Sequence, residues 1–342
     1  MLHGGIRYLE NLDFKLVKEA LEEKNLWIDI APDFAEEKMF LMPVYNDSIR
    51  SLPEIWSGVF LYDLLSKFKN SPSRFFTKKH IIKNYPNLKH NGLRGGGLYA
   101  DAIINDKQLT KAIIKDALKN KKVDAIENCK VIHFTPHKNG YNVKMNYQNK
   151  AIEVFTEELI IATGPFTDKF LSKIDWINWK NCLLPSKGSH LWISSSKLNL
   201  STPIVLTPND GRVIFIIPHG EKTLVGTTEV ETEEDYFDLS PSPEEIAYLL
   251  KNLNEYFPRS KLVESDIISS FSGIRPLVKE DSNDKSSTSR EHKIFQIRNN
   301  LSVIVGGKYT TFRVMGQNIT RNILLKNNLT YNCDLTKQIL KT

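Results

Sequence analysis

The 342-residue sequence predicts an α/β fold, and three observations favour this class. Amphipathic helical stretches at the start of the chain and after Ser242 alternate with apolar, strand-like runs. The run 158–165 contains a glycine near its end, and the run 301–305 is followed by two glycines. Glycines at these places let a ligand or another backbone approach closely. The region between them contains short strands separated by turn pairs such as Asp210-Gly211, a pattern typical of an antiparallel sheet. The length is sufficient for two domains.

The first part of the chain is expected to be mainly helical. Residues 9–30 place apolar side chains at helical spacing among Lys and Glu, and a second helix is expected over 53–68. A basic, aromatic segment then continues to about Arg94. After Gly95-Gly96-Gly97 we expect Asp106 to cap a helix that has one apolar face.

From residue 123 the pattern changes to strands. The runs 123–134 and 141–147 are joined by Asn139-Gly140, a pair that suits the positive φ angles of a tight hairpin turn. Residues 158–165 then indicate a buried strand with a glycine near its carboxyl end. That glycine, Gly164, is a place where a cofactor could approach the backbone.

The remainder of the chain begins with a strand-rich region from Lys187, including runs 213–217 and 223–226. Ser242-Pro243-Glu244-Glu245 predicts a helix start, because serine caps the helix, proline suits its first position and glutamate reaches back to the cap. The stretch 279–289 is polar and loop-like. A buried strand over 301–305, a glycine turn and a helix over 310–325 complete the prediction.

The composition excludes several classes of protein. Hydrophobic residues at 41% and charged residues at 25% are ordinary for a globular protein, and no apolar run approaches the ~20 residues of a membrane-spanning helix. The net charge of +6 accompanies no nucleic-acid-binding motif, so no nucleic acid partner is expected. Cys129, Cys182 and Cys333 are widely spaced and odd in number, which fits a reduced compartment. With no signal segment, we expect a cytoplasmic protein. His133 and His137 flank a predicted strand and turn, so no metal site is predicted.

Four cations, far apart in sequence, lie beside glycines or turns. They are Arg7, Arg275, Arg290 and Lys308. Guanidinium groups bind phosphate through paired donors in a fixed fork, so the set favours a small, strongly anionic ligand such as a phosphate ester. A single arginine of this kind is more simply explained as the partner of a carboxylate that fixes a loop.

Two histidines are candidate bases. Removing the proton of a secondary alcohol requires a group with a pKa near the working pH, and imidazole meets this requirement. His3, directly before Gly4-Gly5, is the first candidate, because nearby cations would keep it neutral. His190 is the second. A histidine directly before two glycines, such as His3, is otherwise more often a turn residue that is hydrogen-bonded to backbone.

The segment from Leu301 to Thr311 is a strand, two glycines and a helix start. Free N–H groups at a helix start favour negative charge, and in a flavoenzyme they stabilise the anion that forms on the flavin ring. Without the rest of the chain, such a turn is more often plain α/β architecture. Lys308 inside the turn favours a ligand site.

Eight segments resemble, in the same order, those of the FAD-dependent glycerol-3-phosphate dehydrogenases, which belong to the D-amino-acid-oxidase-like flavoproteins. They are His3-Gly4-Gly5-Ile6-Arg7-Tyr8-Leu9-Glu10, Ala162-Thr163-Gly164-Pro165-Phe166, Lys187-Gly188-Ser189-His190, residues 210–218, 224–229, 272–277 and 289–292, and Gly306-Gly307-Lys308-Tyr309-Thr310-Thr311-Phe312-Arg313. The resemblance therefore extends over residues 1 to about 325.

The resemblance implies a fold and a reaction. The fold is a split Rossmann-like FAD domain that lacks its first βαβ unit, with an inserted antiparallel β-sheet substrate domain. Its parts would be a partial FAD domain (1–40, 95–186 and 290–328), a helical basic segment (41–94), a substrate domain (187–289) and a tail (329–342). The reaction is the oxidation of sn-glycerol 3-phosphate to dihydroxyacetone phosphate, with hydride transfer to FAD and electrons passing to quinone.

The resemblance also implies residue roles by motif position. The catalytic residues would be His3, Arg7, Arg275 and Lys308. The substrate would be bound by Arg7, Tyr8, His190, Arg275, Arg290 and Lys308. The flavin would be contacted by Gly4, Gly164, Gly306, Gly307, Lys308, Tyr309 and Thr310.

The sequence departs from this family at its start. The family begins with a strand, a G-x-G-x-x-G turn and a helix that bind the pyrophosphate, and the present sequence contains no such segment. The serine-rich approach to the first block and the C-terminal domain of longer members are also absent, and Asp106-Lys107 replaces a D-A-R triplet. We therefore expect a truncated member that binds FAD weakly or not at all.

Two alternatives remain open. The first alternative is a non-catalytic remnant, or a subunit that needs a partner chain for FAD binding. The second alternative is another flavin-dependent amine or hydroxyacid oxidase of the superfamily. The phosphate-type cations disfavour the second alternative, because amine and hydroxyacid substrates carry no phosphate. A homodimer is a candidate assembly.

Aromatic side chains between Trp56 and Arg94 are interleaved with lysines and arginines. This composition suits docking on an anionic lipid surface, such as the inner face of the cytoplasmic membrane, where quinone could collect electrons. A solvated basic face is the alternative.

Overall fold

In the computed structural model, the described residues are 1–232, 236–279, 288–289 and 291–340. They form two compact units. The first contains Met1–Ile28, Ala35–Ile104 and Ser186–Arg275, and the second contains Asp29–Phe34, Asn105–Pro185 and Pro276–Thr342. This division differs from the predicted domains, because it places residues 41–94 together with most of the predicted substrate domain.

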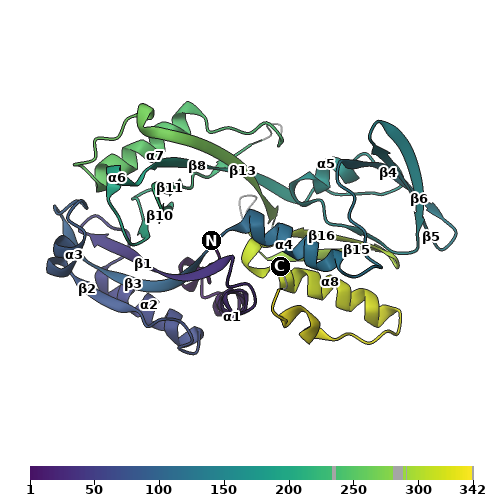
Figure 1. Cartoon of the computed structure of the whole chain (residues 1–342), viewed down its shortest axis with the longest axis horizontal. Helices are drawn as coiled ribbons and strands as arrows, with labels where there is room; N and C mark the ends of the chain where they lie inside the picture. The colour runs from purple at the N-terminus through teal and green to yellow at the C-terminus, as the bar shows by residue number, and fades with distance from the viewer. Residues whose placement is uncertain (233–235, 280–287, 290, 341–342) are drawn as a thin grey trace. The chain divides into compact units, whose positions relative to one another are not determined.

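Strand pairing explains why these regions form one unit. The strands of the first unit follow the order β13-β8-β11-β10-β9-β1-β3-β2, and β12 pairs with β8 (Figure 1). Their bounds are β1 (Ala35–Tyr45), β2 (Arg74–Thr77), β3 (Leu93–Ile104), β8 (Leu183–Ser194), β9 (Ile204–Leu206), β10 (Ile214–His219), β11 (Lys222–Gly226), β12 (Val230–Glu231) and β13 (Ile267–Lys279). Because β1 pairs with both β3 and β9, the early segment is part of the same sheet as the later strands.

The helices of the first unit are η1 (Ile6–Leu9), α1 (Phe14–Ile30), α2 (Leu52–Leu65), α3 (Lys78–Asn84), α6 (Ser195–Leu198), α7 (Pro243–Tyr256) and η3 (Glu264–Asp266). The predicted helix over 9–30 begins only at Phe14, because the preceding residues form a 3₁₀ turn and Leu12 has a positive φ of 61°. The capping box of α7 is confirmed: Ser242 Oγ accepts from the backbone N–H of Glu245, whose carboxylate accepts from the N–H of Ser242.

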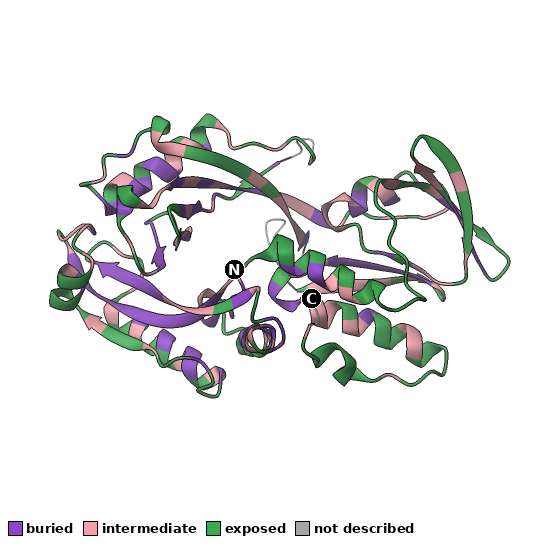
Figure 2. Ribbon diagram, in the orientation of Figure 1, coloured by how far each residue is buried: buried purple, intermediate pink, exposed green. Residues whose placement is uncertain are grey.

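The glycine run 95–97 lies inside strand β3, where the sequence predicted no strand. A Cβ at Gly97 would lie 3.0 Å from Ile55 Cγ2, and one at Gly96 would lie 2.7 Å from the carbonyl oxygen of Met42. Glycine therefore permits α2 and β1 to pack closely against β3. Figure 2 shows β1 and β3 buried along most of their length.

Two apolar cores stabilise the first unit. In one, Leu249 and Leu253 of α7 pack with Leu191 and Ile193 of β8. In the other, α1 and α2 pack on β1 and β3 through residues that include Val17, Leu21, Phe40, Val59 and Tyr62. Burial of apolar side chains at this scale is the main favourable contribution to folding.

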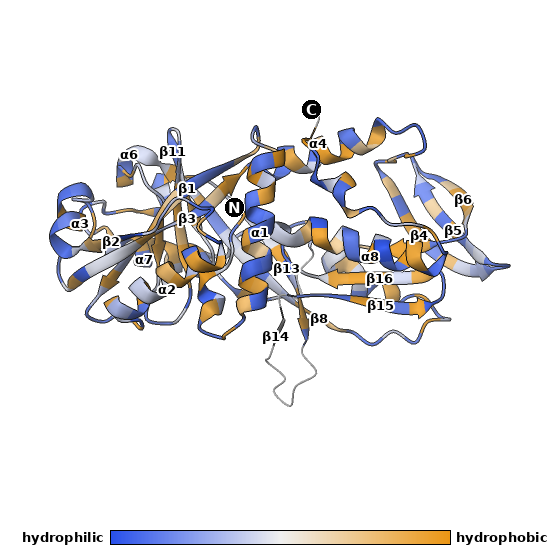
Figure 3. Cartoon of the chain, turned by 90° about the horizontal axis from the view of Figure 1, so that it is seen from below, coloured by the Kyte–Doolittle hydropathy of each residue, from blue (hydrophilic) through white to orange (hydrophobic). Residues whose placement is uncertain are grey.

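The second unit contains two three-stranded sheets. One has the order β4-β5-β6, and the other has the order β15-β16-β7. The bounds are β4 (Cys129–His137), β5 (Gly140–Tyr147), β6 (Lys150–Thr156), β7 (Leu159–Ile161), β14 (Thr288–Ser289, paired with the end of β13), β15 (His292–Arg298) and β16 (Leu301–Gly306). The helices are α4 (Asp106–Leu118), η2 (Gly164–Phe166), α5 (Thr167–Leu171), η4 (Tyr309–Thr311), α8 (Phe312–Lys326) and η5 (Cys333–Lys337). The apolar β16 (Figure 3) is buried in a core with Ile161 and Leu171.

Three local predictions in this unit were wrong in detail. The hairpin turn lies one residue earlier than expected, since Lys138 takes the positive φ of 51° and Gly140 already pairs with His137. The cap of α4 is Asn105, whose side chain accepts from the N–H of Gln108, while Asp106 is the first helical residue. Strand β4 begins at Cys129 rather than at residue 123.

None of the helices in the described ranges combines the length and the apolar character that a membrane crossing requires. Likewise, the described side chains contain no group of three or more His, Cys, Asp and Glu residues that could hold a metal ion.

Candidate functional site

Arg275 lies across strand β8 in the first unit. Its Nη2 donates to Thr227 Oγ1 at 2.7 Å, and its Nη1 lies 3.4 Å from the carbonyl oxygen of Thr228, which it donates to. A Cβ at Gly188 would lie 2.3–2.6 Å from the guanidinium atoms. The glycine of the Lys187–His190 segment is therefore needed because the arginine side chain occupies that space. The guanidinium is held in a defined place, which a binding site requires.

His190 lies on strand β8, within electrostatic range of this arginine. Its ring stacks on Phe271, with centroids 4.9 Å apart and planes inclined by 8°. A Cβ at Gly226 would lie 2.3 Å from His190 Cδ2, so Gly226 gives the imidazole its space. Nδ1 of His190 has no hydrogen-bond partner among the described residues.

Burial lowers the pKa of His190 from 6.5 to about 4, and the Arg275 guanidinium and the α-amino group of Met1 act in the same direction. At neutral pH the imidazole is therefore neutral and can accept a hydrogen bond, but a pKa of about 4 lies well below the working pH that was expected of the base. The effect of the α-amino group also shows that the N-terminal segment lies within electrostatic range of His190.

The N-terminal segment carrying His3, Gly5 and Arg7 is anchored on strand β3. The backbone of Leu2 forms two hydrogen bonds with Ala102, at 2.9 and 3.0 Å. The N–H of Gly4 donates to Asp101 Oδ1 at 3.2 Å, and the hydroxyl of Tyr62 donates to the same oxygen at 2.7 Å. Burial raises the pKa of Asp101 to about 6.

The glycines of this segment are explained by packing. A Cβ at Gly4 would lie 2.5 Å from the hydroxyl of Tyr62, and Gly5 has a φ of 75°. Arg7 lies on η1 with Tyr8 beside it. The ring of Tyr8, predicted to bind substrate, is buried in the core with Val17 and Leu21.

The predicted flavin contacts Gly164 and Gly306 meet at one sheet edge in the second unit. Strands β7 and β16 are parallel, and Ile161 pairs with Val303, so each glycine lies three residues beyond this pair: Gly306 ends β16, and Gly164 begins η2, which follows β7. The carboxyl ends of parallel strands are where α/β proteins bind their ligands. Both glycines have positive φ angles, 54° and 75°.

These glycines differ in what surrounds them. An added Cβ at Gly164 would have no atom within 4 Å, so this backbone is open to an approaching group. A Cβ at Gly306 would lie 2.4 Å from Val278 Cγ2, and one at Gly307 would lie 2.4 Å from Met315 Sδ. The paired glycines of the turn are thus already required by internal packing.

The turn continues through Lys308 into η4 and α8. The N–H of Thr311 donates to the carbonyl oxygen of Lys308 at 3.1 Å, and Thr310 and Thr311 are buried. The hydroxyl of Tyr309 donates to the carbonyl oxygen of Asp106 at 3.0 Å and lies 2.7 Å from Thr110 Oγ1. The hydroxyl of Tyr309, a predicted flavin contact, is therefore held by α4.

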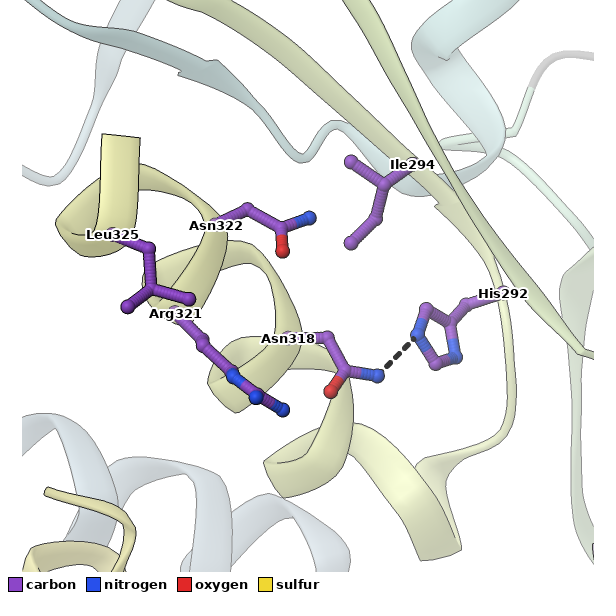
Figure 4. Close-up of a pocket in the computed structure, with 6 residues that line it drawn as sticks. All are labelled: His292, Ile294, Asn318, Arg321, Asn322 and Leu325. Carbon is purple, nitrogen blue, oxygen red and sulfur yellow. Dashed lines mark hydrogen bonds between the residues drawn. The ribbon is translucent and has the colours of Figure 1, made fainter. Parts of the chain in front are cut away.

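A pocket of about 500 Å³ in the second unit was not predicted from the sequence. It lies between β15 and α8 (Figure 4) and is lined by His292, Ile294, Asn318, Arg321, Asn322 and Leu325. Asn318 Nδ2 lies 3.1 Å from His292 Nε2. The signal in the sequence is the spacing of the four α8 residues on one helix face.

The four predicted cations are distributed over both units. Arg7 and Arg275 belong to the first, Lys308 belongs to the second, and Arg290 lies outside the described residues. Sequence reasoning missed Thr227 and Thr228, which hold the guanidinium. The signal in the sequence for these two threonines is the turn Gly226-Thr227-Thr228 after a predicted strand, which lies within one of the eight segments that resemble the family.

Comparison with known proteins identifies the family of this chain. The family model "FAD dependent oxidoreductase" matches residues 1–312. The chain belongs to this FAD-dependent oxidoreductase family. It is 30% identical over 323 residues to the aerobic glycerol-3-phosphate dehydrogenase of Bacillus subtilis, which covers 93% of the chain and 58% of the relative. The chain thus spans somewhat more than half the length of that relative.

Solved structures of FAD-dependent oxidoreductases share the fold. The glycerol-3-phosphate dehydrogenase from Bacillus halodurans complexed with FAD superposes with a TM-score of 0.77 at 25% identity, over 93% of this chain and 57% of its own. Glycine oxidase from Geobacillus kaustophilus matches 95% of this chain and 83% of its own, with a TM-score of 0.67 at 18% identity. The predicted α/β flavoprotein fold and the resemblance to glycerol-3-phosphate dehydrogenases are therefore confirmed.

The described residues fit the ring end of the family's FAD cofactor. The open backbone at Gly164 and the helix start after Lys308 lie at one edge of the β15-β16-β7 sheet, where N–H groups can face a flavin ring. The sequence contains no G-x-G-x-x-G segment for the pyrophosphate. The fit therefore concerns the isoalloxazine end of FAD.

Proposed function

We propose that this chain takes part in the FAD-linked oxidation of sn-glycerol 3-phosphate to dihydroxyacetone phosphate. The carrying observation is the cluster of Arg275 and His190, each lying over a glycine of the antiparallel sheet. This cluster combines a fixed cation, which suits a phosphate group, with a neutral imidazole, which can accept a hydrogen bond from an alcohol. The 30% identity to an aerobic glycerol-3-phosphate dehydrogenase supports the same substrate.

In this proposal the chain's own residues perform three tasks. Arg7 and Arg275 bind the phosphate and the alcohol oxygen of the substrate, and the family resemblance assigns the same task to Arg290 and Lys308. A neutral imidazole, that of His3 or His190, takes the proton of the alcohol as the carbon gives up its hydride. FAD, when bound, supplies the hydride acceptor, and Gly164 and the 306–310 turn hold its ring. Two variants, His3→Asn and His190→Asn, distinguish the candidate bases, because of these two only the variant that lacks the base should lose flavin reduction.

The experiment is anaerobic reduction of FAD by the purified chain at excess FAD. We expect sn-glycerol 3-phosphate to bleach the visible flavin absorbance, while glycerol and glycine do not. The Arg275→Gln variant should lose this reaction, and Arg259→Gln, which changes an exposed arginine of the same unit, should keep it. Bleaching by glycine, or none by glycerol 3-phosphate, would contradict the proposal.

We also propose quinone as the electron acceptor and an anionic lipid surface as the docking site. The aromatic-basic surface on α2, β2, α3 and their connections exposes Phe60, Phe68 and Phe75 at 54%, 60% and 48%. The same segment also exposes basic residues: Lys67, Lys69, Arg74, Lys78, Lys79 and Lys83. Large exposed aromatic side chains among cations suit an interface with acidic lipids.

Co-sedimentation with vesicles tests this docking surface. We expect binding to phosphatidylserine-containing vesicles and little binding to neutral ones at low salt. The double variant Phe60→Ser/Phe68→Ser should lose binding, whereas Phe155→Ser, which changes an exposed phenylalanine on β6, should not. Equal sedimentation with neutral and anionic vesicles would remove the docking proposal.

A second candidate function is that of a subunit that completes its flavin site with another polypeptide. Within the described residues, β7 pairs with β16 alone, and Ile160 in β7 is 42% exposed. Such a strand edge is a place where another chain can add a strand. In this case the chain would bind glycerol 3-phosphate but reduce no flavin by itself.

A further inference from the structure

Glu245 is a buried carboxylate whose contacts go beyond capping its helix. Its Oε2 accepts from the N–H of Ser242 at 3.0 Å and lies 3.2 Å from Lys187 Nζ. Its Oε1 accepts from Thr228 Oγ1 at 2.5 Å and from Ser189 Oγ at 2.7 Å. The side chains of Glu245 and Lys187 are both only 4% exposed. One carboxylate therefore joins α7 to β8 and to the segment after β11.

Two routes lead from this carboxylate to Arg275. Through Thr228, whose carbonyl oxygen accepts from Arg275 Nη1, it fixes the turn in which Thr227 accepts from Nη2 at 2.7 Å. Through Ser189, whose Oγ lies 2.7 Å from Ser272 Oγ, it reaches strand β13 three residues before the arginine. Glu245 thus holds both strand β13, which carries Arg275, and the turn at Thr227 and Thr228, which accepts hydrogen bonds from its guanidinium.

Hydrogen-bond donors and the Lys187 ammonium compensate the negative charge of the buried Glu245. Burial opposes ionisation, but the Ser242 N–H, the Thr228 and Ser189 hydroxyls and the Lys187 ammonium together hold the pKa of Glu245 below its ordinary value. The amino end of α7 contributes in the same direction. Removing the charge would leave the Lys187 ammonium buried beside a neutral group, which is costly.

We propose that Glu245 is a positioning residue for Arg275. By holding Thr228 and Ser189, it orients the guanidinium fork toward the anionic group of the bound ligand. The identity of that ligand as a phosphorylated alcohol rests on the proposed function. The orientation of Arg275 is a property of this chain alone.

The test compares Glu245→Gln with Glu244→Gln. Glu244 is the neighbouring glutamate in the same first turn of α7, but it is exposed, so it is a matched control for the loss of one negative charge. The first readout is the pKa of His190 by NMR, which Arg275 helps to lower. A displaced guanidinium in Glu245→Gln should raise this pKa by roughly 0.5 or more, while Glu244→Gln should leave it unchanged.

The second readout is affinity for sn-glycerol 3-phosphate by calorimetry. We expect Glu245→Gln to weaken binding on the order of tenfold, and Glu244→Gln to change it less than twofold. Movement of the His190 pKa without any glycerol 3-phosphate binding in the parent chain would support the positioning role and contradict only the proposed substrate.

A folded Glu245→Gln chain with an unchanged His190 pKa would overturn the proposal. If that variant fails to fold, Thr228→Val tests the proposal instead. It removes the hydroxyl that donates to Glu245 and keeps the carbonyl oxygen that accepts from Arg275. It should raise the His190 pKa in the same direction. An unchanged value in Thr228→Val would then refute the inference.

Discussion

The buried imidazole of His190 should make the stability of the chain depend on pH in a defined direction. Its folded pKa of about 4 lies below the ordinary 6.5, chiefly because of burial. Between these values the unfolded chain binds a proton that the folded chain does not, so the free energy of unfolding rises with pH. The contribution is complete above pH 6.5 and is lost as the pH falls toward 4.

The magnitude follows from the pKa difference, since each pKa unit corresponds to about 1.4 kcal/mol, which gives roughly 3 kcal/mol for the whole window. Asp101 acts in the opposite sense, because burial raises its pKa from 3.8 to about 6. The folded chain then keeps the Asp101 proton where the unfolded chain has released it, and stability falls as the pH rises through this window. The two effects nearly cancel in the parent chain, so the informative quantity is a difference between chains.

Urea unfolding of the parent and His190→Asn between pH 4.5 and 7.5 measures that difference. The stability advantage of the parent should grow by about 2–3 kcal/mol from the acid to the neutral end. The control His137→Asn changes an exposed imidazole on β4 and should follow the parent. An advantage that is independent of pH, or an NMR titration of His190 centred near 6.5, would refute the reasoning.

Three further predictions test other parts of the site. Gly188→Ala places a methyl group within 2.3–2.6 Å of the Arg275 guanidinium, so it should cost about 1–3 kcal/mol in urea unfolding and weaken substrate binding; unchanged values would contradict the packing argument. Tyr309→Phe removes the hydroxyl contacts with α4 and should cost about 1 kcal/mol of stability, with FAD affinity retained; a selective loss of FAD affinity would assign the hydroxyl to the cofactor instead. Asp101→Asn removes the contribution that opposes that of His190, so its free energy of unfolding should rise between pH 4 and 6 more steeply than that of the parent, and an unchanged pH dependence would exclude the assigned role of Asp101.

Features set by local interactions were predictable from the sequence. The capping box at Ser242 involves residues three positions apart, and it forms as expected. The glycine turn after β16 was also recognised, because a strand, two glycines and a helix follow one another directly. Its register with Gly164 became evident only from the parallel pairing of β7 and β16.

Features that depend on contacts distant in sequence were not predictable. Glu245 was interpreted only as a cap, since its bonds to Ser189 and Thr228 cross 56 and 17 residues. No strand was expected at Gly95-Gly96-Gly97, whereas the close approach of α2 and β1 requires glycine within a strand. The hairpin at residue 138 was displaced by one position, because a Cβ at Gly140 would lie 2.1 Å from the carbonyl oxygen of Thr156.

The central claim is that the site of Arg275 and His190 recognises a phosphorylated alcohol. The most direct measurement is an NMR titration of the arginine side-chain Nε–Hε resonances of the chain with sn-glycerol 3-phosphate, with the Arg275 signal assigned by its loss in Arg275→Gln. The account predicts a saturable shift of the Arg275 resonance that glycerol does not produce, and loss of binding in the variant. An Arg275 resonance unmoved by saturating glycerol 3-phosphate, or undiminished binding in Arg275→Gln, would contradict it.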